Sequence, residues 1–156
     1  MIRFQRTIKD TIQCKGIGLH SGKQVSLVLR PAAPDTGVVF IRTDLGGARV
    51  AAVAANTAAT SYATTLTAGG ASVQTVERLL AALAGLGIDN GSVEIGVDEV
   101  PIMDGSAREF VRLIADAGVR AQARPQPVLK VMKPIFVRDG NKQIAIWPSE
   151  KPSISY

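Results

Sequence analysis

The amino-acid sequence predicts an α+β fold: a two-layer sandwich of a mostly antiparallel sheet with two helices packed on one face, followed by a β-hairpin extension. Three observations predict it. Two segments place apolar residues at helical spacing, several shorter segments alternate apolar and polar residues, and an Asp-Gly-Asn sequence lies near the end of the chain. Strands, a helix, a strand and a second helix follow one another, an order typical of helices segregated to one face of a sheet.

The first helix is predicted over residues 75–86. Its apolar residues recur at i, i+3, i+4 and i+7 and form one stripe: Val76, Leu79, Leu80 and Leu83. Ser72 or Thr75 is a candidate cap for the first turn, because a hydroxyl oxygen can accept one of the free backbone N–H groups there. Gly85 and Gly87 are expected to end the helix.

The second helix is predicted to begin at Ser106. Ser106 and Glu109 have the spacing of a capping box, in which each side chain accepts the free backbone N–H of the other residue. Gly118 is expected to stop this helix. The residues expected to face the core are Phe110, Leu113, Ile114 and Ala117.

Strands are predicted in four short segments before and between the helices. They cover residues 23–30, 38–42, 63–67 and 93–97. In the first segment, Val25, Leu27 and Leu29 alternate with polar residues, the pattern of a strand with one face buried. The domain built from these strands and helices is expected to span residues 1–120.

The last part of the chain predicts a linker followed by a hairpin. Residues 121–127 contain two prolines among polar residues, and this composition disfavours regular structure. Beyond them, residues 128–137 and 143–147 flank the turn sequence Asp139-Gly140-Asn141. Residues 128–156 are therefore expected to form a separate hairpin unit.

The composition is that of an ordinary globular protein. Hydrophobic residues make up 46% and charged residues 20% of the 156 residues, and no apolar run approaches the roughly 20 residues that span a membrane. The net charge is +5, but Lys and Arg are scattered and aromatic residues make up only 4%, so we expect no nucleic-acid surface and at most peripheral membrane contact. Cys14 is the only cysteine and no signal-peptide-like stretch opens the chain, which favours a cytoplasmic location.

Histidine is the scarcest residue with a bearing on metal chemistry. His20 is the only histidine, and catalytic zinc sites usually take three protein ligands, mostly His together with Asp, Glu or Cys. The Asp and Glu residues form no clustered motif of the kind that holds magnesium. We therefore expect this chain to hold no metal by itself.

Three motifs point to a known family. They are residues 16–22 (GIGLHSG), 75–90 (TVERLLAALAGLGIDN) and 101–106 (PIMDGS). In this order and at these separations they resemble the N-terminal half of the UDP-3-O-acyl-N-acetylglucosamine deacetylase family, zinc amidases of lipid A synthesis. The resemblance implies two similar α+β halves with the active site between them. Residues 1–120 would be the first half, and residues 128–156 a truncated lead-in to the second.

The resemblance also implies where the catalytic groups belong. The family has a Glu-His pair at the start of its first helix, in which the Glu is the general base and the His binds zinc, while a further His and an Asp come from the second half. Glu77 matches the base, but Arg78 occupies the position of the histidine. Because a guanidinium has no lone pair to offer a metal, Glu77 is expected to be a retained position without catalytic function.

Three positions are candidates for substrate binding. Arg78 could hold an anion such as a phosphate or carboxylate, or pair with Glu77. His20 lies in a glycine-flanked loop and matches a family residue near the mouth of the active site, and Tyr62 matches an apolar lining residue. An ordinary surface role is the alternative for each of the three. Asp104-Gly105-Ser106 is expected to be a turn before the second helix.

Three hypotheses about function follow. The favoured one is a catalytically silent relative, a binding or regulatory protein related to lipid A synthesis with a sugar nucleotide or another anion as its ligand. The second is the N-terminal part of a longer deacetylase-like enzyme that hydrolyses the N-acetyl group of UDP-3-O-acyl-N-acetylglucosamine. In the third, exposed strand edges of the hairpin pair with a second copy of the chain or with a deacetylase-family partner.

Overall fold

The computed structural model describes residues 3–155. The chain divides into two compact units, Met1–Pro125 and Gln126–Tyr156. Two α-helices and mostly antiparallel strands make up the regular structure of the described residues, so the predicted fold class is confirmed. None of the helices in this part of the chain is long and apolar enough to cross a lipid bilayer.

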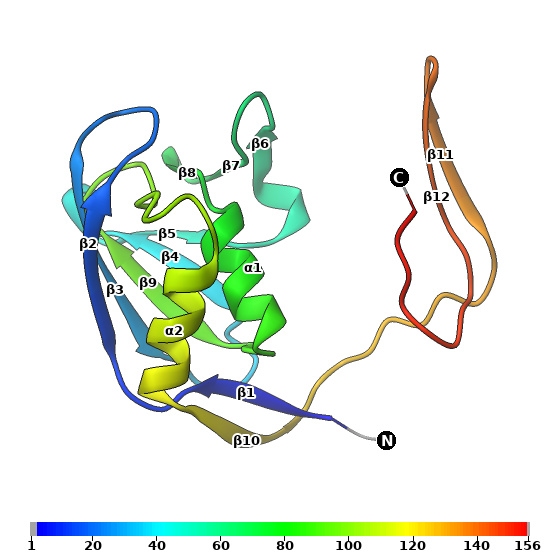
Figure 1. Ribbon diagram of the computed structural model, residues 1–156, viewed down its shortest axis with the longest axis horizontal. Helices are drawn as coiled ribbons and strands as arrows, with labels where there is room; N and C mark the ends of the chain where they lie inside the picture. Colours follow the sequence, from blue (N-terminus) through cyan, green and yellow to red (C-terminus); the bar gives the residue numbers. More distant parts are fainter. Residues whose placement is uncertain (1–2, 156) are drawn as a thin grey trace. The chain divides into compact units, whose positions relative to one another are not determined.

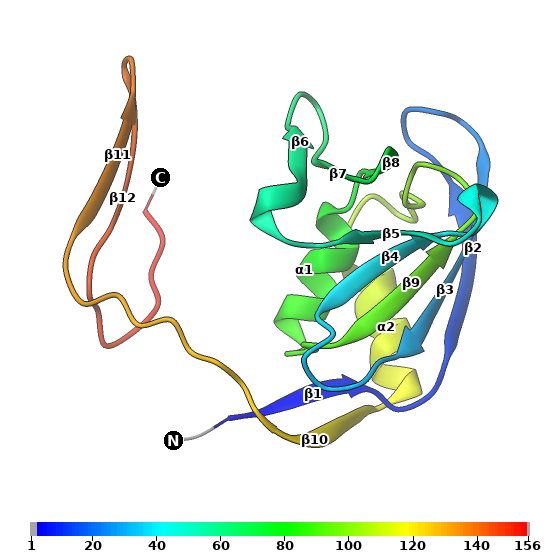
Figure 2. The ribbon, with the colours of Figure 1, turned by 180° about the vertical axis from the view of Figure 1, so that it is seen from behind.

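A five-stranded sheet is the centre of the first unit. Its strands, in spatial order, are β2 (Ile12–Ile17), β3 (Gln24–Pro31), β9 (Gly91–Ile95), β4 (Val38–Arg42) and β5 (Ala48–Ala51). Neighbouring strands are antiparallel except β4 and β9, which run parallel. The helices α1 (Glu77–Gly85) and α2 (Arg108–Ala117) lie side by side across one face of this sheet (Figure 1). Figure 2 shows the sheet from the opposite side, with both helices behind it.

Two smaller sheets also belong to the first unit. One pairs β1 (Phe4–Ile8) with β10 (Val119–Pro125) in antiparallel fashion. The other is an antiparallel sheet of β6 (Thr57–Ala59), β7 (Thr65–Ala68) and β8 (Ala71–Gln74). Single turns of 3-10 helix at Thr43–Leu45 and Ala54–Asn56 connect β4 to β5 and β5 to β6. Because β8 leads directly into α1, the three-stranded sheet places the start of that helix.

The core of the first unit lies between the five-stranded sheet and the two helices. Val25, Leu27 and Leu29 alternate along β3 and are each 1% exposed, as their spacing in the sequence predicts. The helices contribute the buried side chains Leu79, Leu83, Phe110 and Ile114. Burying a side chain of this size stabilises the fold by about 1.5–3 kcal/mol relative to leaving it exposed. The amphipathic pattern of the two helices therefore fixes which of their faces meets the sheet.

Helix α1 begins at Glu77, two residues later than predicted, and the predicted caps are wrong. Val76 occupies the N-cap position and makes no capping bond with its side chain, while Ser72 lies within β8. Thr75 has a φ of +60°, and its hydroxyl donates to the Glu99 carboxylate at 3.1 Å. Because the Thr75 hydroxyl is hydrogen-bonded to this buried carboxylate, it does not cap the helix. The sequence around Thr75 does not reveal a partner that lies 24 residues away.

Helix α2 begins at Arg108 rather than at Ser106, so the predicted capping box is wrong. The Ser106 hydroxyl donates to Asp104 Oδ1 at 2.9 Å and accepts the Arg108 N–H at 3.1 Å. Glu109 pairs instead with Arg112 of the same helix at 3.2 Å. The Ser106 N–H also donates to Asp104 Oδ1, at 3.0 Å, which confirms the predicted turn at Asp104-Gly105-Ser106. This turn delays the first helical residue.

The linker expected over residues 121–127 is shorter in the structure. Its first five residues belong to β10, which pairs with β1 through Arg6 and Ala121, and through Ile8 and Val119. The first unit therefore extends to Pro125 instead of ending at residue 120. Backbone pairing with a strand at the other end of the unit needs no apolar side chains, so a polar, proline-containing segment forms an edge strand here.

The second unit contains the predicted hairpin. Strands β11 (Ile135–Asp139) and β12 (Lys142–Ile146) pair antiparallel, and Asp139 and Lys142 form the last pair before the turn. Gly140 has a φ of +57°, a conformation that glycine adopts at little cost in a two-residue turn. The rings of Phe136 and Trp147 lie edge to face, with centroids 5.8 Å apart.

Candidate functional site

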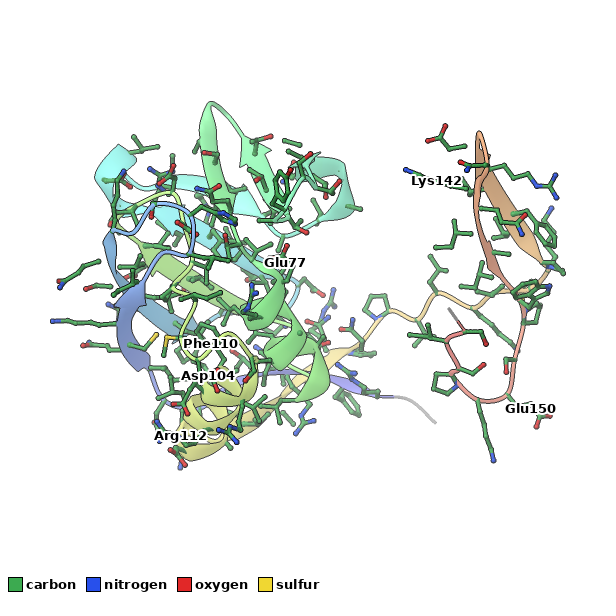
Figure 3. The ribbon with its side chains drawn as sticks, turned by 45° about the horizontal axis from the view of Figure 1, so that its top comes forward. Glu77, Asp104, Phe110, Arg112, Lys142 and Glu150 are labelled. Atoms are coloured by element: carbon green, nitrogen blue, oxygen red, sulfur yellow. The ribbon has the colours of Figure 1, made fainter. Side chains whose placement is uncertain are left out.

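The candidate site lies at the N-terminal end of α1, where β8 passes into the helix. Figure 3 labels Glu77 at this end of the helix. The Glu77 side chain is exposed and accepts the backbone N–H of Thr64, in the segment that leads into β7. One carboxylate therefore joins the helix start to the three-stranded sheet, at a position where the helix dipole favours negative charge.

Glu77 is an ionised carboxylate near neutral pH. Loss of part of its hydration by itself raises the pKa of Glu77, but the N–H groups of Glu77 and Thr64 and the nearby charge of Arg78 together lower it more. The net result is a pKa below the ordinary value for a glutamate. A carboxylate in this state can accept a proton or a hydrogen bond, but it has no proton of its own to donate.

Arg78 turns away from Glu77 and toward the turn before α2. Its Nε donates to the carbonyl oxygen of Gly105 at 2.9 Å. The ion pairs found among residues 3–155 do not include one between Arg78 and Glu77, which was one of the two alternatives for this arginine. Within the described residues 3–155, the terminal NH₂ groups of Arg78 make no hydrogen bond, so they remain available to bind an anion.

A buried carboxylate, Glu99, lies behind this helix start. Glu99 is fully buried, and its Oε1 and Oε2 accept the backbone N–H groups of His20 and Ser21, each at 2.9 Å. Oε1 also accepts the Thr75 hydroxyl at 3.1 Å. Burial raises the pKa of Glu99, but the hydrogen bonds from Ser21, His20 and Thr75 lower it more, so its pKa lies below the ordinary value.

Glu99 is a site residue that the sequence pattern does not reveal. Its neighbours gave only a weak signal, an acid two residues before Pro101, where the third motif begins. Its burial depends on two segments that are distant in sequence: the glycine-rich loop of residues 16–22, and the β8–α1 junction, where Gln74 forms a β-bridge with Glu99. A side chain whose partners all come from elsewhere cannot be recognised from local pattern.

Gly18 shows how closely the glycine-rich loop approaches Glu99. A Cβ placed on Gly18 would lie 2.3 Å from Glu99 Oε2 and 2.3 Å from Ser21 Oγ. The Gly18 N–H also donates a hydrogen bond to the Lys23 carbonyl at 2.9 Å, and the Gly18 carbonyl accepts one from the Gly22 N–H at 3.0 Å. These two hydrogen bonds close the loop. Only glycine leaves room for the carboxylate at this point of the loop.

The other two predicted binding residues are on the surface. His20 presents an exposed imidazole, and its backbone rather than its ring contacts Glu99. Tyr62 is 97% exposed and has a φ of +63°, on the segment between β6 and β7. Tyr62 lies two residues before Thr64, whose N–H is bound by Glu77. Among residues 3–155, hydrogen bonds connect the backbone of His20 to Glu99 and the backbone of Thr64, near Tyr62, to Glu77. The side chains of His20 and Tyr62 make no hydrogen bond to the site in this part of the chain.

The residues at this site do not fit a zinc ion. A zinc site needs imidazole, thiolate or carboxylate donors, and the residue next to Glu77 offers a guanidinium, which has no lone pair to donate. Within residues 3–155, no group of three or more His, Cys, Asp or Glu side chains is placed to hold a metal. Cys14 lies on β2, and burial raises the pKa of its thiol, so the reactive thiolate form is disfavoured.

Fold and site together define an α+β sandwich domain with a polar site where an acid and an arginine open its first helix. Residues 5–156 match the family model of UDP-3-O-acyl N-acetylglycosamine deacetylase, and the chain belongs to this family. The resemblance found in the three sequence motifs is therefore confirmed.

Curated relatives agree with this assignment. The UDP-3-O-acyl-N-acetylglucosamine deacetylase of Pseudomonas entomophila (strain L48) is 48% identical over 157 aligned residues, which cover 100% of this chain and 52% of that protein. The enzyme of the same name from Myxococcus xanthus (strain DK1622) is 50% identical over 152 residues, 97% of this chain and 48% of that protein. The one from Teredinibacter turnerae is 48% identical over 153 residues, 97% of this chain and 50% of that protein. The chain thus spans about half the length of the curated relatives that it matches.

Proposed function

We propose that this domain binds a UDP-3-O-acyl-N-acetylglucosamine-like sugar nucleotide at the N-terminal end of α1 and does not hydrolyse it unaided. The observation that carries the proposal is the identity and placement of Arg78. This arginine stands where the family resemblance implies a zinc-binding histidine, and its Nε is held by the Gly105 carbonyl. The domain would then be a catalytically silent binding or regulatory relative of the deacetylases.

The proposed lack of hydrolysis rests on coordination chemistry. Zinc supplies an activated water and polarises the scissile carbonyl in amide hydrolysis, and a nearby carboxylate then moves the proton. Glu77 is ionised and suited to the proton-accepting role, but the permanent positive charge of Arg78 disfavours a cation beside it. Glu77 is therefore proposed as a retained residue that has no metal-bound water to act on.

Binding of an anionic ligand is supported by the charges that remain at the site. The terminal NH₂ groups of Arg78 can form a fork with a phosphate or carboxylate, and the positive end of the α1 dipole adds to this attraction. His20 and Tyr62 expose large polar side chains on two segments tied to the same helix start. We propose that these two side chains contact the sugar or uracil part of the ligand.

Calorimetric titration of the chain with UDP-3-O-acyl-N-acetylglucosamine tests this proposal. Arg78→Gln is expected to weaken binding about tenfold or more, because a charge-assisted hydrogen bond contributes about 1.5–3 kcal/mol. Arg112→Gln, on the exposed face of α2, is the matched control and should bind like the wild type. Tightly held stoichiometric zinc together with release of acetate by the wild-type chain would refute the proposal.

The alternative is that this domain is the N-terminal part of a longer deacetylase that hydrolyses the N-acetyl group. Its support is that the relatives, which carry the deacetylase name, are about twice the length of the matched region. Mixing this chain with the separately produced remainder of the Pseudomonas entomophila relative, in the presence of zinc, tests it. Acetate release by the wild-type mixture favours the alternative. Release only by the Arg78→His mixture favours a silent relative that has lost a ligand.

A further inference from the structure

We infer that Glu99 is a positioning residue, which holds the glycine-rich loop and the start of α1 in one fixed arrangement. The inference deepens the proposed binding site and rests on the proposed function for its consequence in ligand binding. The positioning itself is a property of the unliganded chain and does not depend on a ligand. Glu99 contacts neither of the two charged residues at the site, so it acts on them through Thr75 and through the backbone of His20 and Ser21.

The carboxylate of Glu99 accepts three hydrogen bonds from two separate segments of the chain. Two of its hydrogen bonds come from adjacent backbone N–H groups of the loop, at 2.9 Å each, and the third comes from the Thr75 hydroxyl at 3.1 Å. The side chain is fully buried, so no solvent competes for these bonds. One buried, ionised group therefore holds donors from both the loop and the residue before the helix.

Thr75 connects Glu99 to the start of α1. It is buried and has a φ of +60°, in the left-handed region that a β-branched residue rarely adopts. Two backbone bonds hold the chain on its N-terminal side, from Gln74 N to Asp98 O at 2.8 Å and from Val100 N to Gln74 O at 3.1 Å. The hydroxyl bond to Glu99 adds a side-chain tie at the strained residue itself, two residues before Glu77.

The geometry therefore joins two segments that sequence separates by more than fifty residues. The loop that carries His20 and the turn that aims Glu77 and Arg78 share one anchor. Removing the charge of Glu99 should loosen both at once, whereas removing the Thr75 hydroxyl should release the helix start and leave the two loop bonds intact. This difference separates a positioning role from a general contribution to stability.

Backbone NMR of the unliganded chain tests the inference. The Thr64 amide donates to Glu77, so its chemical shift follows the ionisation of that carboxylate and reports where the carboxylate lies. Arg78 is the neighbouring charge that lowers the pKa of Glu77, and it is left unchanged in every variant. Glu99→Gln is expected to move the His20 and Ser21 amide signals upfield and to raise the pH midpoint of the Thr64 amide by roughly half a unit, as the Glu77 contacts loosen.

Thr75→Val and Thr75→Ser keep the test decisive if Glu99→Gln does not fold. The valine variant should shift the Thr64 titration without moving the His20 and Ser21 amides, and the serine variant, which retains the hydroxyl, should restore the wild-type profile. Glu94→Gln, an acid on β9 that pairs with Arg30, is the control expected to leave every one of these signals in place. A Thr64 titration that is the same in wild type, Glu99→Gln and Thr75→Val would overturn the inference.

Titration with UDP-3-O-acyl-N-acetylglucosamine separates this inference from the proposed function. If the wild type binds, Glu99→Gln is expected to bind about three- to tenfold more weakly than Glu94→Gln, through displacement of the site and not loss of a contact. A wild type that does not bind refutes the proposed function, and the NMR result still decides the inference. Equal affinity of the two variants would overturn the claim that Glu99 positions the ligand site.

Discussion

Replacing Gly18 by alanine tests the packing of the glycine-rich loop against Glu99. The added Cβ would lie 2.3 Å from both Glu99 Oε2 and Ser21 Oγ and 2.9 Å from Glu99 Cδ, whereas ordinary contact begins at 3.4 Å. The carboxylate is buried and held by three hydrogen bonds, so the roughly 1 Å displacement must break at least one of them or strain the loop. Losing one charge-assisted bond costs about 1.5–3 kcal/mol, and the overpacking adds to it.

The free energy of unfolding of Gly18→Ala is therefore expected to fall by about 3 kcal/mol or more. For a domain of this size that corresponds to a decrease in Tm of roughly 6–12 °C. Far-ultraviolet circular dichroism during urea and thermal unfolding is the suitable assay, because both helices lie in the first unit, whereas Trp147 lies in the second.

Gly85→Ala is the matched control for this experiment. Gly85 is the last residue of α1, its φ is not positive, and an added Cβ would meet nothing within 4 Å. Alanine at this position is expected to leave stability unchanged or raise it by about 0.5–1 kcal/mol, since it lowers the entropy of the unfolded chain. A Gly18→Ala protein within 0.5 kcal/mol of the wild type would refute the placement of Glu99 behind the loop.

Three further predictions follow from the same structure. The folded-state pKa of Glu99 lies below the ordinary value of 4.5, so its contribution to stability is present above that pH and is lost as the pH falls through the folded value. In urea titrations, Glu99→Gln should therefore flatten the dependence of the unfolding free energy on pH between about 6 and 3. An unchanged slope would contradict this reasoning. Phe110→Ala removes a side chain that is 2% exposed between α2 and the sheet, and should lower the unfolding free energy by about 3–5 kcal/mol, whereas the solvent-facing Arg112→Ala should change it by less than about 1 kcal/mol. Gly140→Ala places a Cβ on a residue with a φ of +57° and should weaken the β11–β12 hairpin by about 1–2 kcal/mol, seen as a loss of cross-strand nuclear Overhauser effects between Val137 and Ile144; undiminished effects would show that the turn tolerates a side chain.

Local pattern in the sequence was sufficient for much of the fold. The alternation of Val25, Leu27 and Leu29 predicted a strand with one buried face, and the apolar stripe containing Leu79 and Leu83 predicted the helix that packs on it. The hairpin was equally readable, because a two-residue turn with glycine is specified by the residues in it. These features depend on periodicity and on short-range conformational preference, both of which are properties of adjacent residues.

The motifs also located the candidate site along the chain before its geometry was known. The resemblance to the deacetylase family placed Glu77 and Arg78 at the start of a helix, and the family match over residues 5–156 supports that framework. The sequence alone also established that Arg78 cannot serve as a metal ligand, because this conclusion depends on the chemistry of the guanidinium and not on its surroundings.

Only the tertiary structure decided what each of these residues contacts. The Gly105 carbonyl that binds Arg78 is 27 residues away in sequence, and Glu99 is 24 residues from Thr75 and 79 from His20. The same is true of β10, a polar segment that becomes a strand because β1, more than one hundred residues earlier, supplies its hydrogen-bond partners. Residue type and periodicity determine which face of an element is buried, but the partner of a buried carboxylate or of an edge strand is set by chain segments that meet only when the whole domain is folded.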